Sequence, residues 1–154
     1  MLIMGDTLTA ARAFDRHMPE SIRRIVLVDT FMDEMEESVR LARKMGGRLL
    51  GVRLDTPSEL GGVTPDLVCR VRSGLDRAGH REVKIYVSGG MTPERIREFV
   101  AAGSAVDGFG VGSAISGASP IDFTSDIKAV GRRSVAKRGR KPGLTENTRL
   151  RRVH

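Results

Sequence analysis

Four apolar runs recur along the chain, and each is followed by a small polar cluster and then by a helical pattern. Short continuous apolar runs bounded by turn residues are typical of buried strands in a parallel sheet. Strands are expected at residues 25–28, 49–54, 83–87 and 106–109. Four strand–loop–helix units in series predict an α/β fold in which these strands lie side by side in one parallel sheet.

Helix signals lie before the first strand and between the strands. Residues 7–17 are expected to form a helix because their apolar positions share one face. Acidic residues crowd the start of a second helix, at about 33–44, where negative charge suits the helix dipole. Thr64-Pro65 and Thr92-Pro93 begin two more helices, with threonine as N-cap and proline in the first turn.

The C-terminal segment differs from the rest in charge. From Lys128 onward there are ten Lys and Arg residues against one acid, whereas residues 1–127 carry a net charge of −2. We predict two domains: residues 1–127 form a partial α/β barrel, and residues 128–154 form a basic hairpin and tail that turns at Gly131-Arg132. A basic tail can contact nucleic acid, but the segment lacks the interleaved aromatic residues that stack on bases, so nucleic acid is not the favoured partner.

The length and composition set the class of protein. A closed barrel of eight such units needs about 250 residues, so a chain of 154 residues with four units predicts part of an α/β barrel, roughly half of one. No apolar run approaches the roughly 20 residues that cross a membrane, and the first residues do not resemble a secretory signal. The single cysteine, Cys69, excludes an internal disulfide and is predicted to be a core residue. We expect a cytoplasmic protein.

Two strands are expected to end in aspartates, Asp29 and Asp55. The carboxyl ends of parallel strands are where active sites are built, so both carboxylates should face one crevice. Arg53 lies two residues before Asp55, on the same face of the strand. Two interpretations stay open for each: Arg53 and Asp55 could form a structural ion pair or contact a substrate, and Asp29 could be the N-cap of the next helix or bind substrate.

The other two strands are expected to end in glycine-rich loops. One loop is Ser88-Gly89-Gly90, and the other contains Gly110, Gly112 and Ser113. Glycines let the backbone approach a ligand closely, and the exposed N–H groups at a helix start favour an anion. Two such loops on consecutive parallel strands are typical of barrel phosphate sites, and beside two carboxylates they suit a phosphorylated sugar.

Five motifs in this order and spacing resemble nicotinate phosphoribosyltransferases: VLVDTFMDE, GVRLDTPSELGGVTPDLV, VKIYVSGGM, VDGFGVGSAI and AKRGRKPG. The resemblance runs from about residue 1 to residue 143. It implies an irregular α/β barrel, in an enzyme that joins nicotinate to 5-phosphoribosyl diphosphate to give nicotinate mononucleotide and diphosphate. It further implies ATP as co-substrate, through a transient phosphohistidine, and Mg2+ as cofactor, without a predicted direct protein ligand.

The resemblance also assigns roles to residues. Arg53 and Asp55 match the family's Arg-x-Asp position at nicotinate and ribose, and Asp29 matches its strand-end aspartate. The two glycine loops match its phosphate loops, with these residues: Ser88, Gly89, Gly90, Gly110, Gly112 and Ser113.

Family members are far longer at the N-terminus. We therefore expect an N-terminal half, including the phosphorylated histidine, on another chain or upstream, or else a homo-oligomer.

Two other functions stay open at this point. A quinolinate phosphoribosyltransferase would need a denser basic pocket, because its substrate carries two carboxylates. A non-catalytic remnant that binds phosphate ligands is the second alternative, and intact Asp55 and glycine loops argue against decay.

Overall fold

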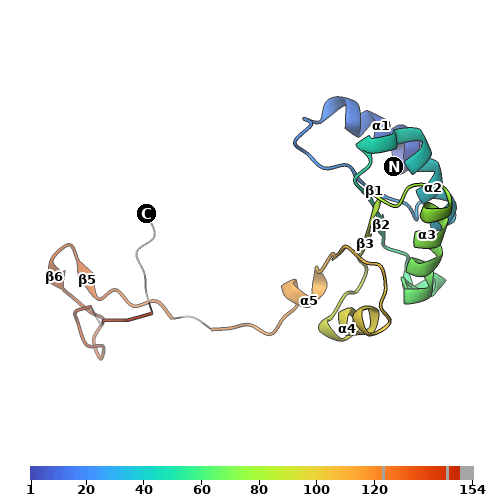
Figure 1. Ribbon diagram of the computed structural model, residues 1–154. Coiled ribbons are helices and arrows are strands. Elements are labelled where there is room, and N and C mark those ends of the chain that lie inside the picture. The colour runs from blue at the N-terminus through green and yellow to red at the C-terminus, as the bar shows by residue number, and fades with distance from the viewer. Residues whose placement is uncertain (123, 145, 150–154) are drawn as a thin grey trace. The chain divides into compact units, whose positions relative to one another are not determined.

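The computed structural model describes residues 1–122, 124–144 and 146–149. The chain divides into two compact units, Met1–Ala118 and Ser119–His154 (Figure 1). The sequence-based boundary between residues 127 and 128 stays a prediction.

The first unit is built on a four-stranded sheet in the order β1-β2-β3-β4, with every neighbouring pair parallel. Its strands are β1 (Ile25–Leu27), β2 (Gly51–Leu54), β3 (Lys84–Val87) and β4 (Gly108–Phe109). Its α-helices are α1 (Thr7–His17), α2 (Glu34–Met45), α3 (Pro65–Arg77), α4 (Pro93–Ala101) and α5 (Ser113–Ser116). Short 3-10 turns lie at η1 (Leu2–Met4), η2 (Gly46–Arg48) and η3 (Ser58–Leu60). The predicted α/β class is confirmed.

Local capping explains where the helices begin. The side chains of Thr64 and Thr92 accept hydrogen bonds from the backbone N–H groups of Leu67 and Arg95, which confirms both threonine caps. The N-cap of α2 is Asp33, whose side chain accepts from two backbone N–H groups. Asp29 is therefore not the helix cap, and the structural reading of this residue is wrong.

The strands are shorter than the sequence predicts. Leu49 and Leu50 precede β2 because the 3-10 turn η2 extends to Arg48. Val106 and Asp107 lie outside β4, which has two residues. Val28 lies beyond the end of β1, although its N–H group still donates to the carbonyl oxygen of Arg53 at 3.2 Å. The apolar runs thus predict which residues are buried, and they include residues outside the hydrogen-bonded strands.

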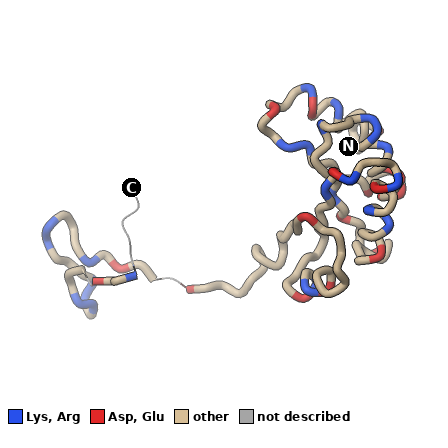
Figure 2. The backbone as a smooth tube through the Cα atoms, in the orientation of Figure 1, with Lys and Arg blue, Asp and Glu red and all other residues tan. Residues whose placement is uncertain are grey.

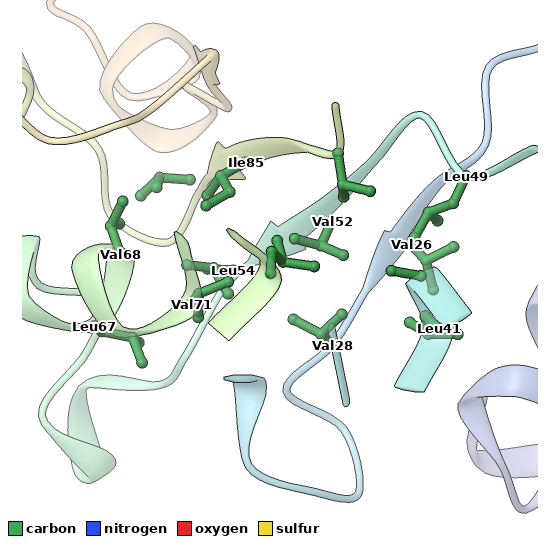
Figure 3. Packing of buried hydrophobic residues seen from close by; sticks show 14 of the residues in the cluster. Val26, Val28, Leu41, Leu49, Val52, Leu54, Leu67, Val68, Val71 and Ile85 are labelled. Carbon is green, nitrogen blue, oxygen red and sulfur yellow. The ribbon is translucent and has the colours of Figure 1, made fainter. Parts of the chain in front are cut away.

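The core lies between one face of the sheet and the helices. Val26, Val52 and Ile85 are in register across β1, β2 and β3, and each is at most 6% exposed. They pack with helix residues such as Leu41 and Val71, which are fully buried (Figure 3). Truncating a leucine in such a core to alanine costs about 2–5 kcal/mol, so this layer holds the unit together.

The opposite face of the sheet has a different character. Its row of residues in register is Leu27, Arg53, Tyr86 and Gly108. Arg53 is exposed, and Leu27 and Tyr86 are half-buried. We call this surface the inner face, because it would face the interior of a closed barrel.

The second unit contains an antiparallel hairpin, β5 (Ala129–Val130) and β6 (Arg133–Ser134). Gly131 adopts a φ of +58° in its turn, which confirms the predicted turn at Gly131-Arg132. Figure 2 marks several Lys and Arg positions in blue along the backbone of this unit. The end of the predicted tail, residues 150–154, lies outside the described residues.

Two other expectations concern Cys69 and the membrane. Cys69 is exposed, so its prediction as a core residue is wrong. It follows Val68 on α3, one position off the buried stripe. Among the described residues, no helix has the length and apolar character needed to cross a membrane.

Candidate functional site

The ends of β1, β2 and β3 meet around Asp55. The backbone N–H of Asp55 donates to the Oδ2 atom of Asp29 at 2.9 Å. A Cβ atom built on Gly89 would lie 2.7 Å from Oδ1 of Asp55, so the Asp55 carboxylate rests against the backbone of Gly89. The structure therefore brings together three predicted site residues from three different strand ends.

The loop after β3 depends on its glycines. Gly89 and Gly90 have φ values of +88° and +61°, a conformation that residues with a Cβ atom rarely adopt. Any side chain at Gly89 would also collide with Asp55. Ser88 is nearly buried, and its backbone N–H donates to the carbonyl oxygen of Leu54 at 2.8 Å. Ser88 thus ties the loop to β2, while the glycines leave the backbone open.

The loop after β4 continues the same edge of the sheet. The backbone N–H of Gly110 donates to the carbonyl oxygen of Val87 at 2.8 Å, and a Cβ on Gly110 would lie 3.0 Å from Cβ of Ser88. Gly112 is the N-cap of α5, which begins at Ser113. Apart from Gly112 and its neighbours in the chain, no atom of the described residues lies within 4 Å of the place where a Cβ of Gly112 would stand. The backbone at this loop is open to a ligand.

Arg53 points to the inner face rather than to Asp55. Among the described residues, the side chain of Arg53 forms no hydrogen bond and no ion pair, so the alternative of a structural ion pair with Asp55 is not observed. Its side chain lines a cavity of about 890 Å³ on the inner face. Most of the side chains that line the cavity are apolar, and the N-terminal segment forms one of its walls. The lining residues are Met1, Leu2, Ile3, Ile25, Leu27, Thr30, Arg53, Tyr86, Phe109 and Gly110.

The electrostatics of the strand ends centre on Asp29. Partial burial raises the pKa of Asp29 above its usual 3.8, and the neighbouring carboxylates of Asp55 and Glu34 raise it further. Hydrogen bonds from the backbone N–H groups of Asp29 and Asp55 act in the opposite direction. Carboxylates crowded in this way favour a cationic or hydroxyl-bearing ligand, because such a ligand relieves their mutual repulsion.

Sequence reasoning missed Tyr86, which lies in register with Arg53. A Cβ on Gly51 would lie 2.9 Å from Cε2 of Tyr86, and a Cβ on Gly108 would lie 3.1 Å from Cδ1 and Cε1. The ring therefore fills the space that two glycines leave on either side. The alternation that places Arg53 and Asp55 on one face also applies to Tyr86 and Ser88, but the register between strands is needed to bring Tyr86 next to Arg53.

Oxygen ligands for a metal are few in the described part of the chain. It contains no group of three or more His, Cys, Asp or Glu side chains placed to hold a metal ion. Asp29 and Asp55 are hard oxygen donors of the type that Mg2+ accepts, and such ions are often bound through one or two carboxylates plus substrate phosphates. The residues thus offer two oxygen donors that a hard cation such as Mg2+ accepts.

Two carboxylates and two glycine-rich loops lie at the ends of the parallel strands, and the comparison with known proteins identifies the family of the chain. The family described as "Quinolinate phosphoribosyl transferase, C-terminal domain" matches residues 1–126. The chain belongs to this family, which is a family of enzymes.

Individual relatives carry the name that the motifs suggest. Nicotinate phosphoribosyltransferase pncB2 of Mycobacterium tuberculosis is 34% identical over 110 residues, which are 69% of this chain and 22% of that protein. Nicotinate phosphoribosyltransferase of Bacillus subtilis is 27% identical over 110 residues, which are 70% of this chain and 21% of that protein. These relatives confirm the resemblance to nicotinate phosphoribosyltransferases.

A solved structure extends the likeness to the fold. The crystal structure of nicotinate-nucleotide pyrophosphorylase from Pyrococcus furiosus is similar with a TM-score of 0.73 and 44% identity, over 93% of this chain and 36% of that one. The predicted phosphoribosyltransferase-type fold is thereby confirmed. The chain spans about a fifth of the length of the curated relatives it matches.

Proposed function

We propose that the chain forms the strand-end part of a phosphoribosyl-transfer site, in an enzyme that joins nicotinate to 5-phosphoribosyl diphosphate and releases nicotinate mononucleotide and diphosphate. The observation that supports this most is the position of Asp55, whose carboxylate lies against Gly89 while its N–H donates to Asp29. A carboxylate beside an open glycine loop can hold ribose while the backbone holds phosphate.

Each residue has a role in this proposal. Asp55 stabilises the positive charge that develops on the ribose ring as the bond to diphosphate lengthens, and Asp29 holds the backbone of Asp55 in place. The open backbone at Gly90 and Gly112 binds phosphate. Arg53 binds the carboxylate of the acceptor from the inner face, in the bidentate manner typical of arginine.

The proposal also covers the co-substrates. Mg2+ would come with the diphosphate and neutralise part of its charge, with Asp29 and Asp55 as the protein oxygens within reach of the same loops. ATP hydrolysis would drive the reaction, as the resemblance implies. The whole enzyme would include residues that this chain does not contribute, or a second copy of it.

A second candidate is quinolinate phosphoribosyl transfer. It is supported by the description of the matching family and by the 44% identity to a nicotinate-nucleotide pyrophosphorylase. The two candidates differ in the number of carboxylates on the acceptor. Arg53 is the cation that lines the inner-face cavity in the described part of the chain, which favours the acceptor with one carboxylate.

The test measures binding and turnover separately. Purified protein is titrated with 5-phosphoribosyl diphosphate by calorimetry, with Mg2+, and then incubated with nicotinate or quinolinate, each with and without ATP. We expect the protein to bind 5-phosphoribosyl diphosphate. We also expect nicotinate mononucleotide to form from nicotinate once the full enzyme is assembled. Mononucleotide formed only from quinolinate would favour the second candidate. Absence of 5-phosphoribosyl diphosphate binding would overturn the proposal.

A further inference from the structure

On the inner face, the ring of Tyr86 lies next to the guanidinium of Arg53, whose side chain has no partner within the described residues. We propose that Tyr86 forms the surface on which the pyridine ring of the acceptor stacks, while the acceptor's carboxylate turns toward Arg53. This inference rests on the proposed function and adds a specificity-determining residue to it.

The position of Tyr86 is fixed by its neighbours. Tyr86 is in register with Arg53 on β2 and with Gly108 on β4. The edges of its ring lie over Gly51 and Gly108, and a methyl group at Gly51 would also lie 2.7 Å from the carbonyl oxygen of Lys84. The two glycines therefore make room for the ring, which stays half-buried and lines the cavity. A ring held in this way needs little ordering when a ligand arrives.

The chemistry of the cavity suits a flat aromatic carboxylate. Aromatic rings attract each other in offset-stacked or edge-to-face arrangements, and an arginine binds a carboxylate through two parallel hydrogen bonds. Neighbouring strands lie about 4.8 Å apart, so a ring over Tyr86 places its substituent near Arg53. Arg53 has no other partner among the described residues, and the remaining walls are mainly apolar, including Leu27 and Ile25.

One property of the sequence makes the contact directly observable. Tyr86 is the single tyrosine of the chain, which has no tryptophan. The intrinsic fluorescence of the protein therefore reports on this ring alone. Stacking of an electron-poor pyridine ring on Tyr86 should quench that fluorescence.

The experiment titrates the full chain with nicotinate, with quinolinate and with cyclohexanecarboxylate, each with and without 5-phosphoribosyl diphosphate. Calorimetry and tyrosine fluorescence are recorded in parallel. We expect saturable quenching by an aromatic acid and none by cyclohexanecarboxylate. Arg53→Gln should weaken binding of every carboxylate by about 10- to 100-fold, because a charged hydrogen-bonding partner is lost.

Variants of Tyr86 separate stacking from a structural role. Tyr86→Leu should weaken binding of the aromatic acids by about two- to tenfold and leave the affinity for cyclohexanecarboxylate unchanged. Tyr86→Phe should keep the affinity for the aromatic acids. If calorimetry shows binding of the diphosphate and of nicotinate while the fluorescence stays constant, the inference is wrong and the proposed function stands. If neither ligand binds, the proposed function fails, and the inference fails with it.

Discussion

The two ends of the parallel sheet use the same residue types in opposite ways. At the amino end, Arg24 is 6% exposed, and its Nε atom donates to Oδ1 of Asp15 at 2.8 Å. Its remaining N–H groups donate to backbone carbonyl oxygens, including those of Pro19 at 2.8 Å and Met18 at 2.9 Å. Near the carboxyl end, Arg53 is exposed and has no such partner in the described part of the chain.

This difference separates stability from function. A buried guanidinium loses its hydration, and only a complete set of hydrogen-bond acceptors offsets that loss. The acceptors around Arg24 provide such a set, so losing this side chain should destabilise the fold. An exposed guanidinium stays hydrated in both the folded and the unfolded protein, so it carries little desolvation free energy. Arg53 is therefore available to a ligand. Barrel folds in general place stability at the amino ends of their strands and chemistry at the carboxyl ends.

The largest effect should come from removing the buried arginine. Arg24→Met should lower the free energy of unfolding by about 3 kcal/mol, because several backbone carbonyls and Asp15 lose their donor. The value lies at the lower end for buried pairs because Asp15 keeps a second partner, Arg48, at 2.8 Å. The matched variant Arg53→Met should change the free energy of unfolding by less than about 0.5 kcal/mol. Urea denaturation measures both, and equal losses would remove the distinction between the two ends.

At the carboxyl end, the expected loss is catalytic. Asp55→Asn should reduce phosphoribosyl transfer about 100- to 1000-fold, because the developing positive charge loses its counter-charge. Its effect on unfolding should be small, since Asp55 is half-buried and contacts the backbone of Gly89. The control Asp76→Asn removes a surface carboxylate that pairs with Arg72 and should leave transfer unchanged. A comparable loss of transfer in both variants would contradict the assignment of Asp55.

A smaller effect is expected at the phosphate loop after β4. Gly112→Val should fold normally, because its φ is −116° and, apart from its neighbours in the chain, no described residue lies within 4 Å of the added Cβ. The side chain should block the approach of phosphate and weaken binding of 5-phosphoribosyl diphosphate by about tenfold or more. Calorimetry of this variant against Gly47→Val, at an open glycine away from the strand-end loops, measures the difference. Unchanged affinity would mean that this loop is not a phosphate site.

The smallest effects concern pH, and the two ends should respond with opposite sign. A hydrogen bond from Arg24 lowers the pKa of Asp15 below its usual 3.8, so the stability that its charge provides is present above pH 3.8 and is lost as the pH falls through the lowered value. Burial raises the pKa of Asp29 above 3.8, so its contribution is present below pH 3.8 and is lost as the pH rises through the raised value.

Two neutral variants test these signs. At neutral pH, Asp15→Asn should lower the free energy of unfolding, and Asp29→Asn should raise it slightly while keeping an acceptor for the N–H of Asp55. Urea denaturation from about pH 3 to about pH 7 follows both. A loss of stability in Asp29→Asn at neutral pH would show that its hydrogen bond outweighs the cost of burying its charge.

The sequence predicts the parts of this molecule that local chemistry determines. Thr64 and Thr92 start their helices as expected, because an N-cap followed by proline acts within one turn. The order of the strands follows from four units in series. The sequence predicted that Asp55 and Gly89 face one crevice, but not that they touch. That contact depends on loop conformations that the pattern of apolar and polar residues does not define.

Features that depend on distant partners escaped prediction. Arg24 follows no pattern, since most of its acceptors are carbonyl oxygens of the irregular segment between α1 and β1. Tyr86 looks like one more residue of an apolar run, and only the register of β2 and β3 brings it beside Arg53. Cys69 was placed in the core because helical periodicity defines a stripe only to within about one position.

The close fit of Tyr86 between two glycines limits how this surface can diverge among relatives. At Gly108, within the part of the chain that the structure describes, only the tyrosine ring would contact an added side chain, so a relative with a smaller residue at position 86 is free to carry alanine or serine at position 108. At Gly51 the carbonyl oxygen of Lys84 blocks any side chain, whatever occupies position 86. Positions 86 and 108 should therefore co-vary across evolution while position 51 stays invariant.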